Sequence, residues 1–108
     1  MKTIVITSNQ IEGFHRYPNA PMEVDFLKSR HRHVFYVECG FNVKHDDRDI
    51  EIFMQQSEIR KYINNEFGIP AEFGNMSCEM IARNILTEFN CNYVKVTEDE
   101  RGGAIIQR

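Results

Sequence analysis

The sequence predicts a single α+β domain over residues 1–108, with an antiparallel four-stranded sheet and two helices on one face. Residues 31–44 alternate between apolar and more polar side chains, which is the period of a half-buried strand. Residues 56–67 and 77–89 instead repeat their apolar side chains at helical spacing. Residues 92–108 resemble a β-hairpin around two glycines. The resulting order is β-β-α-α-β-β.

The N-terminal third is less regular. Residues 2–8 are β-branched and predict the first strand. A loop containing Gly13, Pro18 and Pro21 is expected next, because proline has no N–H for the hydrogen bonds of a central strand. Residues 22–27 are expected to extend again.

The two helices have start and stop signals. The first is predicted from Ile52, Ile59, Ile63 and Phe67, at spacings of seven, four and four. Residues 50–54 remain open between a strand end and a helix start, and Gly68 is expected to end the helix. Residues 71–76 form a predicted link, after which Ser77 is suited to cap the second helix. In the closing hairpin, residues 92–98 and 104–108 pair across a turn at 101–103.

Composition limits the functional classes. The net charge of −3 does not suit a protein that binds a nucleic-acid polymer. Three cysteines without a paired spacing suggest a reducing compartment. No apolar run approaches the roughly 20 residues of a membrane span. These features predict a soluble, cytoplasmic protein with no membrane partner.

Three histidines form the strongest chemical signal. His31 and His33 are two residues apart in the predicted strand, so their imidazoles point to the same face. His15, sixteen residues earlier, can supply a third nitrogen, and three protein ligands with an open position are typical of catalytic zinc. The alternative is that His31 and His33 are polar residues at a strand start and that His15 lies in a loop. His45 is expected to be solvated in a charged turn.

Four passages resemble the tunnelling-fold family of 6-pyruvoyltetrahydropterin synthase and 6-carboxytetrahydropterin synthase. They are Gly13-Phe14-His15-Arg16-Tyr17, His31-Arg32-His33, Ser77-Cys78-Glu79-Met80-Ile81-Ala82, and Val94 to Glu98 with Gly102-Gly103-Ala104. The resemblance implies zinc ligands at His15, His31 and His33, and a pterin anchor at Glu98. It also implies zinc as the cofactor of a pterin-forming lyase.

The chain departs from these enzymes at three points. The enzymes carry a catalytic cysteine shortly before His-x-His, whereas residues 27–30 contain none. They place an Asp-His pair between the helices, whereas residues 64–76 contain neither residue. Arg32 replaces the central glycine. Because proton transfer needs titratable groups near the substrate, these departures favour a protein without catalysis.

A second resemblance, in size and topology, is to phage Thoeris anti-defence proteins that sequester cyclic ADP-ribose signals. It implies a cofactor-free protein that binds a small nucleotide-like ligand without turning it over. The lyase is the alternative. Guanidinium groups bind phosphate through paired hydrogen bonds, and an aromatic ring can stack on a base. The predicted ligand-binding residues are Arg30, Phe89, Asn92, Glu98, Arg101 and Arg108. For each arginine singly, an ordinary surface charge is the alternative.

The open edges of the predicted sheet favour self-association. Exposed edge strands are usually paired or protected, and neither 2–8 nor 104–108 contains a proline. We therefore expect a symmetric homo-oligomer, a trimer or a dimer of trimers, as the resembled tunnelling-fold family forms.

Overall fold

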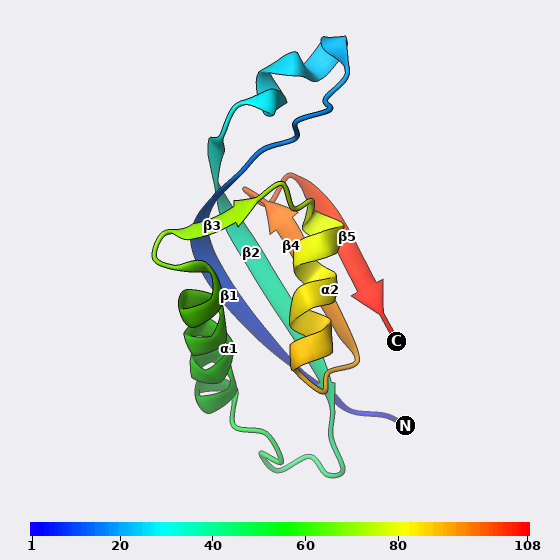
Figure 1. Cartoon of the computed structure of the whole chain (residues 1–108). Helices are drawn as coiled ribbons and strands as arrows, with labels where there is room; N and C mark the ends of the chain where they lie inside the picture. The colour runs from blue at the N-terminus through cyan, green and yellow to red at the C-terminus, as the bar shows by residue number, and fades with distance from the viewer.

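The computed structural model describes all of residues 1–108, and its sheet has five strands in the order β3-β1-β2-β4-β5. The elements are β1 (Ile4–His15), η1 (Met22–Lys28), β2 (His31–Asn42), α1 (Ile52–Phe67), β3 (Ala71–Gly74), α2 (Cys78–Glu88), β4 (Tyr93–Glu98) and β5 (Gly102–Gln107). Both α-helices lie on the same face of the sheet (Figure 1). The α+β class is confirmed, but the sheet is mixed, with one strand more than predicted.

The first strand is much longer than the predicted 2–8. β1 reaches His15 and pairs with β2 along its whole length. Its inward positions include Thr7 and Asn9, which are buried although polar. Asn9 is held by a hydrogen bond from its Nδ2 to the Gln56 carbonyl oxygen, 3.2 Å away. The prediction stopped short because tertiary contacts, not β-propensity, keep these residues in the strand.

Residues 16–30 project from the sheet as an arm (Figure 1). The predicted extended segment at 22–27 is wrong, because these residues form the 3-10 helix η1. Pro21 stands immediately before this helix, where its fixed φ of −64° is compatible with a helix start. No residue of η1 is buried, and Met22 and Phe26 are largely exposed.

The predicted link at 71–76 contains the fifth strand. β3 runs parallel to β1, with Gly13 opposite Ala71 and Phe14 opposite Glu72. Ala71 and Phe73 are buried, and the Phe73 ring lies 4.9 Å from that of Phe35. β3 forms because α1 returns the chain beside β1, which a local pattern of four residues cannot reveal.

The helices follow the prediction closely. The residues left open at 50–54 are resolved as the helix start, since α1 begins at Ile52 after Glu51 caps the Met54 N–H at 3.0 Å. Ser77 caps α2, as expected, by accepting from the Met80 N–H at 3.2 Å. The helices and the sheet enclose an apolar core whose fully buried members include Phe35, Val37, Cys39, Ile59, Ile63, Ile81 and Ile85. None of the helices combines the length and apolarity that crossing a bilayer requires.

The closing hairpin turns earlier than predicted. Asp99 and Glu100 have positive φ values of 52° and 60°, and they form the turn together with Arg101, so the turn spans 99–101 instead of 101–103. Gly102 and Gly103 already belong to β5. β5 is an outer strand, as expected, whereas β3 partly covers the other edge.

Candidate metal centre

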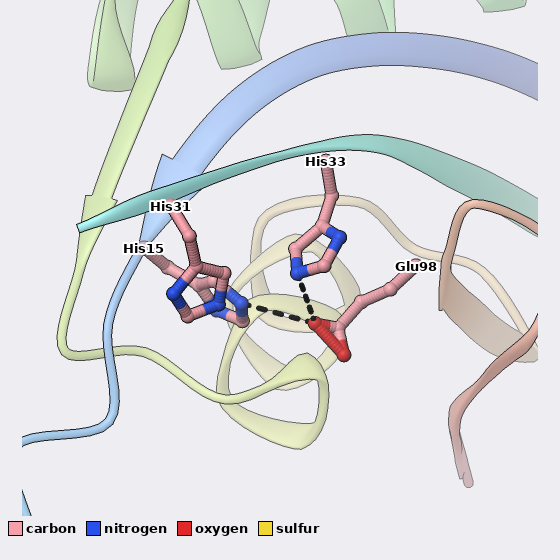
Figure 2. Close-up of side chains that lie close together, drawn as sticks. All are labelled: His15, His31, His33 and Glu98. Carbon is pink, nitrogen blue, oxygen red and sulfur yellow. Dashed lines mark ion pairs between the residues drawn. The ribbon is translucent and has the colours of Figure 1, made fainter. Parts of the chain in front are cut away.

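Three adjacent strands bring the histidines and Glu98 together. His15 ends β1 and lies directly opposite His31, the first residue of β2. His33 follows on the same face of β2, and Glu98 at the end of β4 is paired with Phe35. Cross-strand neighbours on one face of a sheet lie within side-chain contact. The strand register therefore builds the cluster that Figure 2 shows.

The four side chains converge tightly. One ligand atom from each residue can be chosen so that all four lie within 4.8 Å of one another. The Nε2 atoms of His15 and His33 are each 3.0 Å from Oε2 of Glu98 (Figure 2). The ring centroid of His31 is 4.6 Å from that of His15. This spacing fits a single small ion at the centre of the cluster.

Hydrogen bonds fix which nitrogen of each ring is free. Nδ1 of His15 lies 2.9 Å from the Met76 carbonyl oxygen, and Nδ1 of His31 lies 2.8 Å from that of Ser29. A carbonyl oxygen only accepts, so both Nδ1 atoms carry the proton and donate it. Each Nε2 is then left with its lone pair, as a metal ligand requires.

Two of these nitrogens are buried without a hydrogen-bond partner. His15 is 9 % exposed, and the Nε2 atoms of both His15 and His33 are orphaned. Their approach to Glu98 brings opposite charges close when the rings are protonated, but it lacks hydrogen-bond geometry. A buried polar atom without a partner costs about 1–3 kcal/mol. A divalent ion bound by these nitrogens would remove that cost, and imidazole with carboxylate is a ligand set that suits zinc.

The charges in the cluster favour cation binding. Burial alone lowers the pKa of His15, but the Glu98 carboxylate and the Met76 carbonyl oxygen outweigh it, so the net shift is upward. The pKa of Glu98 is lowered, first by its contact with His15. Glu98 is therefore an anion at neutral pH and places negative charge beside the three rings.

The cluster opens into a cavity of about 780 Å³. Its walls include the base of the arm, at Arg16 and Tyr17, and the start of α2 at Ser77 and Cys78. Burial and neighbouring carboxylates raise the pKa of the Cys78 thiol to about 12, so it stays protonated at neutral pH. The sequence analysis did not select Cys78, because its helical spacing resembles that of a core residue.

The predicted ligand-binding residues do not form one site within the chain. Glu98 and Arg101 lie at the turn beside the histidines, whereas Asn92 and Arg108 lie at the opposite end of β4 and β5. Arg108 donates to the carbonyl oxygens of Leu86 and Cys91, both at 2.7 Å, and so ties down the end of α2.

The other two predicted residues also lie away from the cavity. Phe89 is half-buried and packs against the Tyr62 ring at 5.6 Å. Arg30 stacks on Phe14 at 3.6 Å and pairs with Glu72 through two hydrogen bonds. Within one chain Arg30, Arg101 and Arg108 do not converge, because the length of β4 and β5 separates Arg101 from Arg108. The guanidinium groups of Arg30 and Arg108 are also already engaged.

No protein-family model matches the chain, and no curated protein is significantly similar to it in sequence.

Proposed function

We propose that the protein is a zinc protein whose metal centre holds and activates a small molecule in the adjacent cavity. The observation that carries this proposal is the convergence of three imidazole rings, two of which present buried Nε2 atoms without partners. Three histidines leave one coordination position toward Glu98 and the cavity. An oxygen of Glu98 or of a bound small molecule suits that position.

Zinc bound there would polarise a carbonyl or hydroxyl oxygen of the small molecule. The residues of the chain supply the remaining chemistry. The Glu98 carboxylate accepts hydrogen bonds or a proton from the ligand, because its lowered pKa keeps it ionised. The thiol of Cys78 lines the same cavity, and because its pKa is raised to about 12 it keeps its proton and can donate a hydrogen bond to a ligand. This set supports acid–base chemistry beside a metal.

The substrate class that we propose is a reduced pterin, in a reaction of the 6-pyruvoyl- or 6-carboxytetrahydropterin synthase type. The motif resemblance around His15, His31-Arg32-His33 and Glu98 supports this choice. The resembled enzymes take their thiol from a segment before His31, where this chain has none. Cys78 instead offers a thiol from the start of α2, which lines the same cavity.

Sequestration of a nucleotide-like signal stays a prediction, because the arginines expected to bind phosphate are dispersed in the chain. Arg16 is the arginine that lines the cavity. The same assay distinguishes the two functions, since a sequestering protein releases its ligand unchanged and a lyase does not. Assembly into a homo-oligomer likewise stays a prediction.

The test begins with metal analysis of the purified protein by mass spectrometry. We expect about one zinc per chain, retained in His45→Ala and lost in the double variant His31→Ala/His33→Ala. His45 is a matched control because it is exposed and lies outside the cluster. Equal metal content in all three proteins would refute the site.

The zinc-loaded protein is then incubated with dihydroneopterin triphosphate, and products are followed by chromatography. We expect turnover that depends on zinc and is lost in Cys78→Ala. Intact recovery of the pterin together with tight binding of cyclic nucleotides would instead establish sequestration.

A further inference from the structure

Asp99 contacts the metal cluster from outside. It follows Glu98 directly, and in a continuous strand two consecutive side chains point to opposite faces. Yet both carboxylates reach His33: Glu98 lies 3.0 Å from Nε2, and Asp99 lies 2.7 Å from Nδ1. The imidazole of His33 therefore has a hydrogen-bond partner at Nδ1 in Asp99, while its Nε2 faces Glu98 without a hydrogen bond.

The backbone of the turn makes this arrangement possible. Asp99 has a φ of 52°, in the left-handed region that few residues other than glycine, asparagine and aspartate adopt readily. Its N–H donates to the Val34 carbonyl oxygen at 2.9 Å, which continues the pairing of β4 with β2. Its side-chain Oδ1 accepts from the Val34 N–H, also at 2.9 Å. The carboxylate thus takes the place of a strand carbonyl.

The second oxygen of the same carboxylate is left for His33. With Oδ1 held by Val34, Oδ2 points at Nδ1 of the imidazole. An ionised carboxylate only accepts hydrogen bonds. The proton of neutral His33 is therefore drawn to Nδ1, and Nε2 keeps its lone pair.

We propose that Asp99 is a positioning residue that fixes the tautomer and orientation of His33 so that Nε2 faces the metal. This inference rests on the proposed zinc centre. Outer partners of metal-bound histidines typically change metal affinity by about 10- to 100-fold when they are removed.

Asp99→Asn is an informative variant because it keeps the shape of the side chain but replaces one accepting oxygen with an NH₂ group, which donates. Asparagine tolerates the left-handed conformation, so the turn is retained. Its Oδ1 can still accept from the Val34 N–H, but its NH₂ group then faces Nδ1 of His33. That arrangement is satisfied only when His33 carries its proton on Nε2, which blocks metal binding. Rotating the amide instead places its NH₂ group against the Val34 N–H, where two donors meet.

Glu100→Gln is the matched control. It removes the same charge from the neighbouring position of the same turn, which also has a positive φ, of 60°. Glu100 is not one of the four clustered residues, and its carboxylate lies beside Tyr36. A change in zinc affinity that both variants share is therefore caused by the loss of negative charge. A change confined to Asp99→Asn is caused by the altered hydrogen bond to His33.

The experiment has two readouts. Long-range ¹H–¹⁵N spectra of the metal-free proteins at pH 8 report which nitrogen of His33 is protonated. We expect Nδ1–H in the wild type and Glu100→Gln, and Nε2–H in Asp99→Asn. Competition with a chromophoric chelator measures zinc affinity, which we expect to fall about 10- to 100-fold in Asp99→Asn alone.

The inference is overturned if Asp99→Asn keeps the wild-type tautomer and affinity, or if Glu100→Gln weakens zinc equally. Wild-type protein that binds no zinc would refute the proposed function instead. In that case the spectra of the metal-free proteins still decide whether Asp99 sets the tautomer of His33.

Discussion

Zinc should stabilise the fold, and His31→Ala should abolish most of that effect. The four clustered side chains belong to three different strands, so their ligand atoms come together only in the folded chain. An ion that binds the folded state alone raises its stability by mass action. His31 is the best ligand to remove because it is only partly buried, whereas truncating buried His15 also leaves a cavity.

The expected magnitude follows from chain length. Free zinc at 100 times its dissociation constant adds about 2.7 kcal/mol to the free energy of unfolding. For 108 residues the unfolding entropy is about 0.23 kcal/mol per kelvin, so zinc raises Tm by about 12 °C. A structural zinc site contributes about 10–16 kcal/mol from four ligands, so one ligand accounts for about 2.5–4 kcal/mol. Its removal weakens zinc binding by about 10²- to 10³-fold and leaves a shift of about 2 °C or less at the same zinc concentration.

Differential scanning calorimetry, with and without a zinc buffer, measures these shifts. Without zinc, His31→Ala should unfold within a few degrees of the wild type, which shows that the fold is intact. His45→Ala should keep the full zinc shift. The reasoning fails if zinc raises the Tm of His31→Ala as much as that of the wild type, or raises neither.

Three further predictions concern single groups. Glu98→Gln should weaken zinc about tenfold or more in chelator competition, because it removes the anion 3.0 Å from two Nε2 atoms; unchanged affinity would exclude Glu98 as a ligand. The pKa of His15 is raised above 6.5 and that of Glu98 is lowered below 4.5, so their contact stabilises the metal-free fold most between about pH 4.5 and 6.5. Above that window the stabilising contribution of His15 is lost, and zinc binds more tightly because its histidine ligands are deprotonated. The zinc-dependent rise in Tm should therefore grow from pH 6 to 8, and a smaller rise at pH 8 would contradict this. Arg108→Ala should lower stability by about 1–3 kcal/mol in urea unfolding, because carbonyl oxygens at the end of α2 lose their donor. Arg101 is exposed, so Arg101→Ala should change the free energy of unfolding by no more than about 0.5 kcal/mol. If Arg101→Ala and Arg108→Ala changed it equally, the hydrogen bonds of Arg108 would contribute little to stability.

The sequence alone determined the elements whose periodicity is regular. The alternation from His33 to Val43 predicted β2, and the helical spacing predicted both helices, with Ser77 marking the start of α2 and Gly68 the end of α1. Such signals are local: a residue's position in the repeat fixes the face on which it lies. The pairing of His31 with His33 as potential ligands followed from the same two-residue period.

Tertiary structure decided the rest of the site. His15 was selected as a third ligand with a loop position as the alternative, and it reaches the cluster because β1 continues through polar residues to a position opposite His31. The sequence did not single out Asp99, because its role depends on a left-handed backbone that places it against Val34. β3 and the distant position of Arg108 likewise depend on how separate segments meet. Contacts between residues far apart in the sequence carry no periodic signal, so only the folded chain reveals which side chains share a site.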